Sequence, residues 1–241
     1  MIMRTFGFST GALAKGNFRK ALEVLSDKRT KVVELSALRQ EELPILLNAL
    51  TDLDLSEFSY VSVHAPSSIR PGTEPEVATQ LQAVLSRGWP IVVHPDIIFN
   101  SHVWRGLGSQ LCIENMDARK STGRTADELT QIFSAFPDAS FCCDLGHARQ
   151  VDPTMVEATR ILRKFGERLK QLHVSEVNAR STHDRLSLAS VTAFSKVFHL
   201  IPDDIPIVLE TPVSSGEIER EISHAREALP SQHQKLLLRA V

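Results

Sequence analysis

Eight short, apolar, β-branched runs recur along the 241-residue chain and limit its fold class more than any other pattern. Most lack the alternation of polar and apolar residues that marks a strand with one wet face. They are therefore predicted to be strands buried on both faces, as in a parallel sheet. The predicted strands are Thr5–Ser9, Lys31–Leu35, Tyr60–His64, Pro90–His94, Leu111–Glu114, Ser140–Asp144, Lys170–Val174 and Pro206–Glu210.

The segments between these runs carry apolar residues at the spacing of amphipathic helices, for example Leu129, Ile132, Phe133 and Phe136. The segment Ile97–Leu107 is short and irregular and is the least helical of them. Strand followed by helix, eight times, predicts an α/β protein with a single (β/α)₈ TIM-barrel domain over residues 1–241. A doubly wound open sheet is the alternative, but no GxGxxG motif follows the first strand to support it.

Two helix starts carry recognisable capping patterns. Thr125 with Glu128 three residues later fits a capping box, and Asp152–Pro153 fits a cap followed by proline at the first helical position. The C-terminal run Leu236–Leu238 is expected to pack on the barrel or on a partner chain, which would make the protein a homo-oligomer.

Charge and cysteine usage exclude several classes of function. With 27 basic and 29 acidic residues the net charge is −2, so no global field attracts nucleic acid or an anionic membrane. The three cysteines form no CxxC motif and lie in apolar runs, which predicts reduced core residues. Met1–Leu13 lacks the apolar core of a signal peptide, and no stretch is long enough to span a membrane. We expect a cytoplasmic protein.

Polar residues gather where the predicted strands end, which is where a TIM barrel places its chemistry. They are Glu34, His64, His94, Glu114, Asp144, His173 and Glu210, with His147 one turn after strand 6 and Glu176, His183 and Asp184 after strand 7. A single strand-end histidine or glutamate is usually a hydrogen-bonded structural residue. So many in one narrow mouth would repel and lose hydration, at a cost of several kcal/mol each, unless a cation held them. Imidazole with carboxylate, and no thiolate, suits Zn²⁺, Mn²⁺, Fe²⁺ or Co²⁺.

Basic residues also gather in the loops at this end. They are Arg119, Lys120, Arg124, Arg149, Arg180 and Arg185. A clamp for phosphate or carboxylate and a set of solvated loop charges are both consistent with this pattern.

The strand ends VHAP (63–66), VVHPD (92–96), IEN (113–115), CDLGHA (143–148), LHVSEVN (172–178) and VLET (208–211) resemble the xylose-isomerase-like TIM-barrel superfamily over nearly the whole chain. That superfamily contains sugar-phosphate isomerases and epimerases and also endonuclease IV, the type member of AP endonuclease family 2. The resemblance to the isomerase branch implies one ion held by Glu114, Asp144, His173 and Glu210. It also implies that Glu114 and Glu210 act as acid and base on a carbohydrate-like substrate through an enediolate.

The same branch suggests His147 and Glu176 as residues that contact the substrate. We also expect substrate contacts from His64, His94, Arg180 and Lys120. The resemblance to endonuclease IV instead implies three zinc ions with His64, His94, His147 and His183 as additional ligands. Two departures count against DNA as the substrate: His183–Asp184 does not reproduce the spaced Asp-x-His of those nucleases, and NMDARKSTG (115–123) lacks their small-residue run.

The leading hypothesis from the sequence is thus a metal-dependent isomerase or epimerase of a sugar, sugar phosphate or related polyol. The alternative is a phosphoester hydrolase with two or three ions, and a third is a barrel that binds a ligand without catalysis. Ion count distinguishes the first two, since one ion favours isomerisation and two or three favour hydrolysis.

Overall fold

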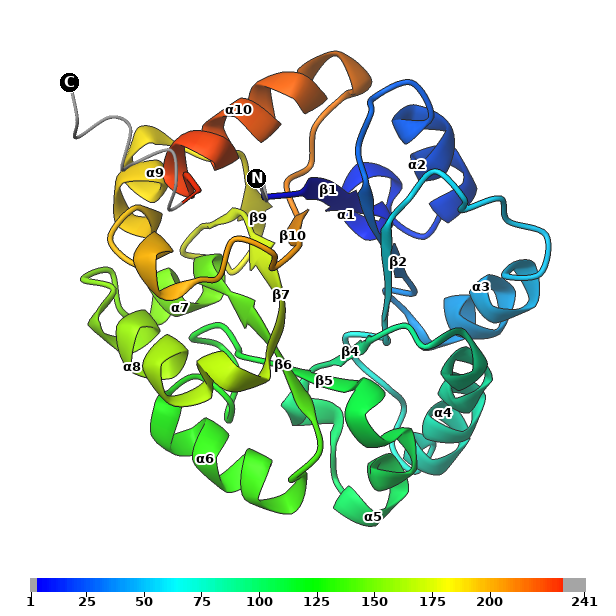
Figure 1. Ribbon diagram of the computed structural model, residues 1–241. Helices are drawn as coiled ribbons and strands as arrows, with labels where there is room; N and C mark the ends of the chain where they lie inside the picture. Colours follow the sequence, from blue (N-terminus) through cyan, green and yellow to red (C-terminus); the bar gives the residue numbers. More distant parts are fainter. Residues whose placement is uncertain (1–3, 232–241) are drawn as a thin grey trace.

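The computed structural model describes residues 4–231, which form a closed barrel of eight parallel strands surrounded by helices (Figure 1). The order around the barrel is β1-β10-β7-β6-β5-β4-β3-β2, so neighbours along the chain are neighbours in the sheet and the last strand closes onto the first. The predicted (β/α)₈ architecture is confirmed. The barrel strands are β1 (Phe6–Ser9), β2 (Val32–Ser36), β3 (Tyr60–His64), β4 (Ile91–Val93), β5 (Leu111–Glu114), β6 (Ser140–Asp144), β7 (Leu169–Val174) and β10 (Ile207–Leu209).

Each predicted strand agrees with the observed one to within one residue at either end. The runs are apolar throughout because one face of each strand packs on helices and the other fills the barrel. A small antiparallel hairpin, β8 (Glu176–Val177) with β9 (His183–Asp184), lies in the loop after β7 and was not predicted.

Ten α-helices lie within the described residues and cover the outside of the barrel (Figure 1). The irregular segment after β4 forms a 3₁₀ helix (Pro95–Ile97), the four-residue helix α5, and a second 3₁₀ stretch that is kinked at Gly108, whose φ is 55°. No helix among residues 4–231 is both long and apolar enough to cross a membrane. The helices are α1 (Thr10–Ala14), α2 (Phe18–Leu25), α3 (Leu43–Ala49), α4 (Glu74–Leu81), α5 (Ser101–Trp104), α6 (Ala126–Ala135), α7 (Leu145–Val151), α8 (Val156–Phe165), α9 (Leu188–Phe194) and α10 (Ile218–Ala228).

One of the two predicted caps needs correction. Thr125 is the N-cap of α6, and its hydroxyl accepts the N–H of Glu128 as expected. The expected cap at Asp152–Pro153 is wrong, because α8 begins at Val156 after Met155, whose φ of 68° is left-handed. The Asp152 carboxylate still serves the helix start, since it accepts the N–H of Glu157 at 2.8 Å.

The core has two parts. The larger part lies between the strands and the helices, and a small cluster of Val92, Cys112 and Cys142 forms a separate apolar group. All three cysteines are buried and unbonded, as predicted. Leu236–Leu238 lies outside the described residues.

The remaining barrel interior is polar, where TIM barrels usually carry branched apolar side chains. Glu34, Ser62, Gln171 and His173 are all fully buried. Because β2 runs on to Ser36, Glu34 lies below the rim, paired in register with Ser62 of β3 and Ser9 of β1. This buried polar layer lies below the cluster of histidines and carboxylates at the strand ends.

Candidate metal centre

Glu114, at the end of β5, lies at the centre of four histidines. Its Oε2 is 3.2 Å from Nε2 of His64 and 3.2 Å from Nε2 of His94. Its Oε1 is 3.2 Å from Nδ1 of His173 and 3.4 Å from Nδ1 of His147. The Glu114 side chain is almost fully buried, so each of its oxygens faces a pair of potential metal ligands rather than water.

The end of β6 holds Asp144 beside Glu114. The side-chain amide of Asn115 donates to the carbonyl of Asp144 at 2.9 Å and accepts its N–H at 2.8 Å, which fixes the two strand ends together. Asp144 Oδ1 accepts the N–H of His147 as the N-cap of α7. Its other oxygen, Oδ2, is buried and has no hydrogen-bond partner, although Nδ1 of His147 lies 3.5 Å away.

The charges at the mouth shift the pKa values of these groups strongly. Burial and the neighbouring carboxylates raise the pKa of Asp144 to about 6, although His147 opposes the shift. Burial opposes protonation of His64 and His147, but the carboxylates around them, Glu114 above all for His64 and Asp144 for His147, outweigh it. The pKa of His64 rises to about 9 and that of His147 to about 10. Burial dominates at His94 and lowers its pKa. The carboxylate cluster therefore favours positive charge beside it.

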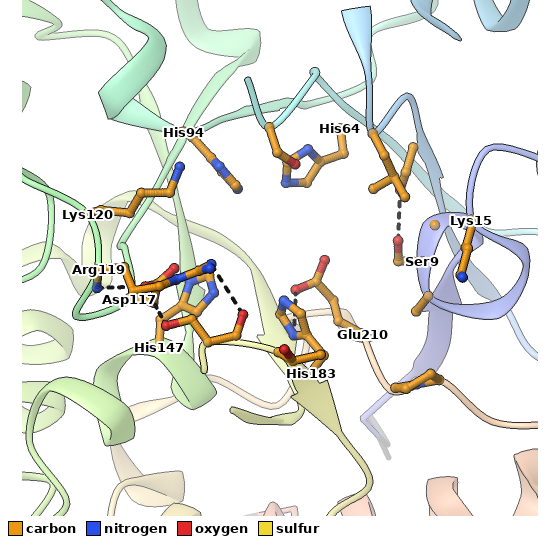
Figure 2. Close-up of a pocket in the computed structure, with 18 residues that line it drawn as sticks. Ser9, Lys15, His64, His94, Asp117, Arg119, Lys120, His147, His183 and Glu210 are labelled. Atoms are coloured by element: carbon orange, nitrogen blue, oxygen red, sulfur yellow. Dashed lines mark hydrogen bonds and ion pairs between the residues drawn. The ribbon is translucent and has the colours of Figure 1, made fainter. Parts of the chain in front are cut away.

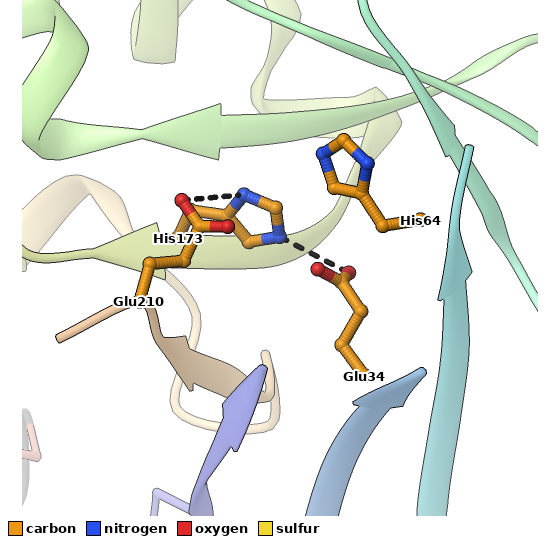
Figure 3. A group of neighbouring side chains, drawn as sticks. All are labelled: Glu34, His64, His173 and Glu210. Carbon is orange, nitrogen blue, oxygen red and sulfur yellow. Dashed lines mark hydrogen bonds and ion pairs between the residues drawn. The ribbon is translucent and has the colours of Figure 1, made fainter. Parts of the chain in front are cut away.

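Three groups within residues 4–231 place their ligand atoms within 4.8 Å of one another. The first is Glu114, Asp144, His173 and Glu210, the set implied by the isomerase resemblance; the second is His64, His94 and Glu114; the third is Glu34, His64, His173 and Glu210 (Figure 3). The buried, unpartnered Asp144 Oδ2 and His94 Nδ1 add to the case. This donor set fits a divalent ion of the Zn²⁺, Mn²⁺, Fe²⁺ or Co²⁺ type.

A cavity of about 350 Å³ opens directly onto this cluster (Figure 2). Five of the candidate ligands line it, namely His64, His94, His147, His183 and Glu210. A volume of this size is typical of a small-molecule site. Ser175 Oγ lies 2.7 Å from Nδ1 of His183, and Glu210 Oε2 lies 3.6 Å from the same nitrogen, so the hairpin brings His183 to the cavity wall.

Three cations stand around the cavity: Lys15 after α1, and Arg119 and Lys120 after β5. Lys120 is bound to Asp96 at 2.5 Å, and Lys15 lies on the opposite side of the cavity (Figure 2). Asp117 joins the loops after β5 and β7, because its Oδ1 accepts the Arg119 N–H and the Ser181 hydroxyl. Arg119 and Lys120 are thus paired with aspartates, and hydrogen bonds cross-link the rim.

Several expected substrate contacts lie elsewhere. Glu176 does not line the cavity; it pairs with Arg149 at 3.2 Å and accepts the N–H of Ser187. Arg180 is exposed and also lies outside the cavity lining. Of the other loop cations, Arg124 pairs with Glu128, and Arg185 with Glu217.

The sequence did not single out Asp117, Ser181 or Lys15 as lining residues. Asp117 follows the strand-end glutamate by three residues, which is the signal that could have identified it. Lys15 follows the first helix and carries no such signal. Glu34 was noticed as a strand-end residue but given no role.

Comparison of the whole chain with known proteins bears on its fold. No protein-family model matches the sequence, and no curated protein does. Endonuclease IV from Thermus thermophilus superposes with a TM-score of 0.60 at 18% identity, over 93% of this chain and 98% of that one. This superposition shows that the two proteins share the TIM-barrel fold.

Two further solved structures agree. SacUVDE has a TM-score of 0.54 at 16% identity, covering 87% of this chain and 82% of that one. The 3-keto-D-glucoside 4-epimerase YcjR from E. coli has a TM-score of 0.52 at 13% identity, covering 94% of this chain and 99% of that one. The resemblance carried by the strand-end motifs is confirmed at the level of fold. Since DNA-acting and sugar-acting proteins share it, the reaction has to be argued from the site.

Proposed function

We propose that this protein is a divalent-metal-dependent phosphoester hydrolase whose two ions share Glu114. The observation that carries the proposal is the geometry of that carboxylate: Oε2 faces His64 and His94, while Oε1 faces His173 and His147. A carboxylate with separate ligand groups on its two oxygens suits a bridged pair of ions. Two-ion sites of this kind are typical of enzymes that cleave phosphoester bonds.

The residues divide between two ion positions. His64 and His94 with Glu114 would hold one ion, and Asp144, His173 and Glu210 with Glu114 would hold the other. Divalent ions held by these residues would polarise the phosphoryl oxygens and offset the charge that develops on them. Lys15, Arg119 and Lys120 surround the cavity with positive charge and favour an anionic substrate.

We assign proton transfer to groups that are accessible from the cavity. Glu210 and His183 are partly exposed, and their side chains approach to 3.6 Å. The Ser175 hydroxyl engages Nδ1 of His183, which leaves Nε2 as the nitrogen available to a leaving group. His64 and His94 are nearly buried and suit ion binding better than proton exchange with solvent.

The test joins a metal count to a substrate comparison. Protein purified without chelator should carry two ions per chain by elemental analysis. It should cleave model phosphodiesters or phosphomonoesters, with an abasic-site oligonucleotide as a separate arm for nucleic acid. One ion per chain together with turnover of ketoses and none of phosphoesters would contradict the proposal.

The second candidate is the isomerase or epimerase favoured by the sequence. Its support is that Glu114 and Glu210 both approach Nδ1 of His173, at 3.2 and 3.5 Å, so two carboxylates stand beside one ion position. A cavity of about 350 Å³ also suits a monosaccharide. Epimerisation of a ketose panel, followed by solvent deuterium exchange at the carbon next to the carbonyl, tests this alternative.

A further inference from the structure

We propose that Glu34 is a positioning residue: it accepts the Nε2 proton of His173 and thereby presents Nδ1 of that ring to a metal ion. The inference rests on the proposed metal centre, since it concerns one ligand of that centre. Glu34 lies on β2, on the opposite side of the barrel interior from β7, and nothing in the strand-end pattern assigned it a role.

The two nitrogens of His173 face different surroundings. Nδ1 points to the mouth, 3.2 Å from Glu114 and 3.5 Å from Glu210. Nε2 points into the barrel, 3.1 Å from Oε2 of Glu34 (Figure 3). Both side chains are fully buried, so water does not compete for this contact. A ligating histidine commonly donates its second N–H to a carboxylate, which fixes the ring and its tautomer.

Gln171 offers a competing arrangement, in which its amide donates to Nε2 of His173. Its Nε2 lies 2.8 Å from Nε2 of His173 and 2.7 Å from Oε2 of Glu34. The Tyr60 hydroxyl donates to Oε1 of Gln171 at 2.8 Å, and burial raises the pKa of Tyr60, so this hydroxyl keeps its proton. The amide nitrogen is thereby oriented toward both Glu34 and Nε2 of His173, so one N–H can donate to the carboxylate and the other to the ring.

When Nε2 of His173 carries the proton, Glu34 Oε2 is the acceptor for both nitrogens. If Nε2 of His173 instead accepted from Gln171, the ring proton would sit on Nδ1 and block the ion. Ion binding at Nδ1 therefore requires the Glu34 arrangement. The Ser62 hydroxyl adds a further bond to the same oxygen at 2.9 Å, which holds the carboxylate in place.

The other oxygen of Glu34, Oε1, is buried without a hydrogen-bond partner. Glu34 belongs to the group with His64, His173 and Glu210, so direct ligation by Glu34 is the rival role. The two roles differ in ion count. If Glu34 is a positioning residue, its substitution weakens metal affinity but leaves the number of bound ions unchanged. If Glu34 is itself a ligand, its substitution removes the ion that it binds.

The experiment uses Zn²⁺ alone as the probe, with affinity and stoichiometry from chelator competition and calorimetry on the full-length protein. Glu34→Gln should weaken the ion at His173 by about 10- to 100-fold, with the ion count unchanged. Glu34→Asp, which keeps the charge, should recover part of the loss. The matched control is Glu74→Gln, a buried glutamate whose Oε1 also accepts three hydrogen bonds, from Phe99, Asn100 and Trp104. It should bind Zn²⁺ as the wild type does.

A second readout needs no variant. In Zn²⁺-loaded wild-type protein with ¹⁵N-labelled histidine, NMR should show His173 with its proton on Nε2 and the metal on Nδ1. The reverse assignment, an unchanged affinity in Glu34→Gln, or loss of an ion from its count would each overturn the positioning role while leaving the metal centre intact. A wild-type protein that binds no Zn²⁺ would overturn both.

Discussion

His64 and Glu114 meet at 3.2 Å, Nε2 to Oε2, and so join the end of β3 to the end of β5 across the barrel mouth. The same oxygen lies 3.2 Å from His94, while the other oxygen serves His173 and His147. One carboxylate thus links two sets of potential ligands. Most of the predictions below follow from this sharing.

Replacing Glu114 by glutamine should abolish binding at both ion positions, because the amide lacks the charge that both share. We expect less than about 1% of wild-type turnover on whichever substrate class is active, which corresponds to more than about 2.7 kcal/mol of transition-state stabilisation. Elemental analysis and circular dichroism of the purified variant check the ion loss and the retained fold. An active variant with two ions would contradict the bridging role.

Asp144→Asn and His94→Gln should each remove a different ion. Asp144 belongs only to the group with His173 and Glu210, and His94 only to the group with His64. Each variant should therefore retain about one ion per chain, and the double variant none. If either single variant loses both ions, the two positions are not independent, and a single shared site explains the data better.

Gly146→Ala should destabilise the protein and weaken metal binding together. Gly146 stands between Asp144 and His147 in α7, and an added Cβ would lie 2.5 Å from the backbone carbonyl oxygen of Ser175. The start of α7 must shift to relieve this contact, at a cost of about 1–3 kcal/mol in the free energy of unfolding. Urea titration and Zn²⁺ affinity measure both effects. Gly166→Ala is the control, since nothing lies within 4 Å of its added Cβ and its φ of −56° suits alanine.

The two loop cations Lys120 and Arg180 should behave differently. Lys120 lines the cavity, whereas Arg180 is exposed outside it. Lys120→Ala should raise KM for an anionic substrate by about tenfold, because a charged hydrogen bond of about 1.5 kcal/mol is lost. Arg180→Ala should leave KM unchanged. Steady-state kinetics at several salt concentrations test this, and equal effects of the two variants would place the substrate further out on the rim.

We expect Asp152 to contribute to the free energy of unfolding in a pH-dependent way. Its carboxylate accepts hydrogen bonds from Thr154 and from the N–H of Glu157. These bonds, the Thr154 bond most of all, lower the pKa of Asp152 in the folded protein below its unfolded value. A lowered pKa gives stability that is present above the unfolded pKa of about 3.9 and is lost as the pH falls through the folded pKa. Asp152→Ala should thus cost less than about 1 kcal/mol at pH 7, because solvent screens this carboxylate. Urea unfolding should show the difference from wild type shrinking as the pH falls below about 4.

The barrel could be predicted from the sequence because its strands are buried on both sides. A continuous apolar run such as Ser140–Asp144 is visible without any structural context, and the polar residue that ends it marks the mouth. The convergence of Glu114, Asp144, His173 and Glu210 follows from the same reasoning, since parallel strands end at one edge.

The loop after β7 could not be predicted in the same way. Its two hairpin strands are two residues long, too short for any period, and their pairing turns Glu176 toward Arg149 and Ser187 instead of the cavity. The start of α8 was misplaced because the left-handed Met155 is a conformation that propensity does not anticipate. The contact between Glu34 and His173 joins strands that are not neighbours, so no local pattern encodes it.

The side-chain amide of Asn115 hydrogen-bonds to both the N–H and the C=O of Asp144. These bonds hold the carboxylates of Glu114 and Asp144, at the ends of β5 and β6, at a fixed separation. His64 and His94 reach the same glutamate from β3 and β4 through their rings. The Asp144 side of the mouth is thus fixed by backbone hydrogen bonds, whereas the side with His64 and His94 contacts Glu114 through side chains. Altered preference among metals should arise by substitution on the histidine half, where a ring can be exchanged without disturbing the sheet.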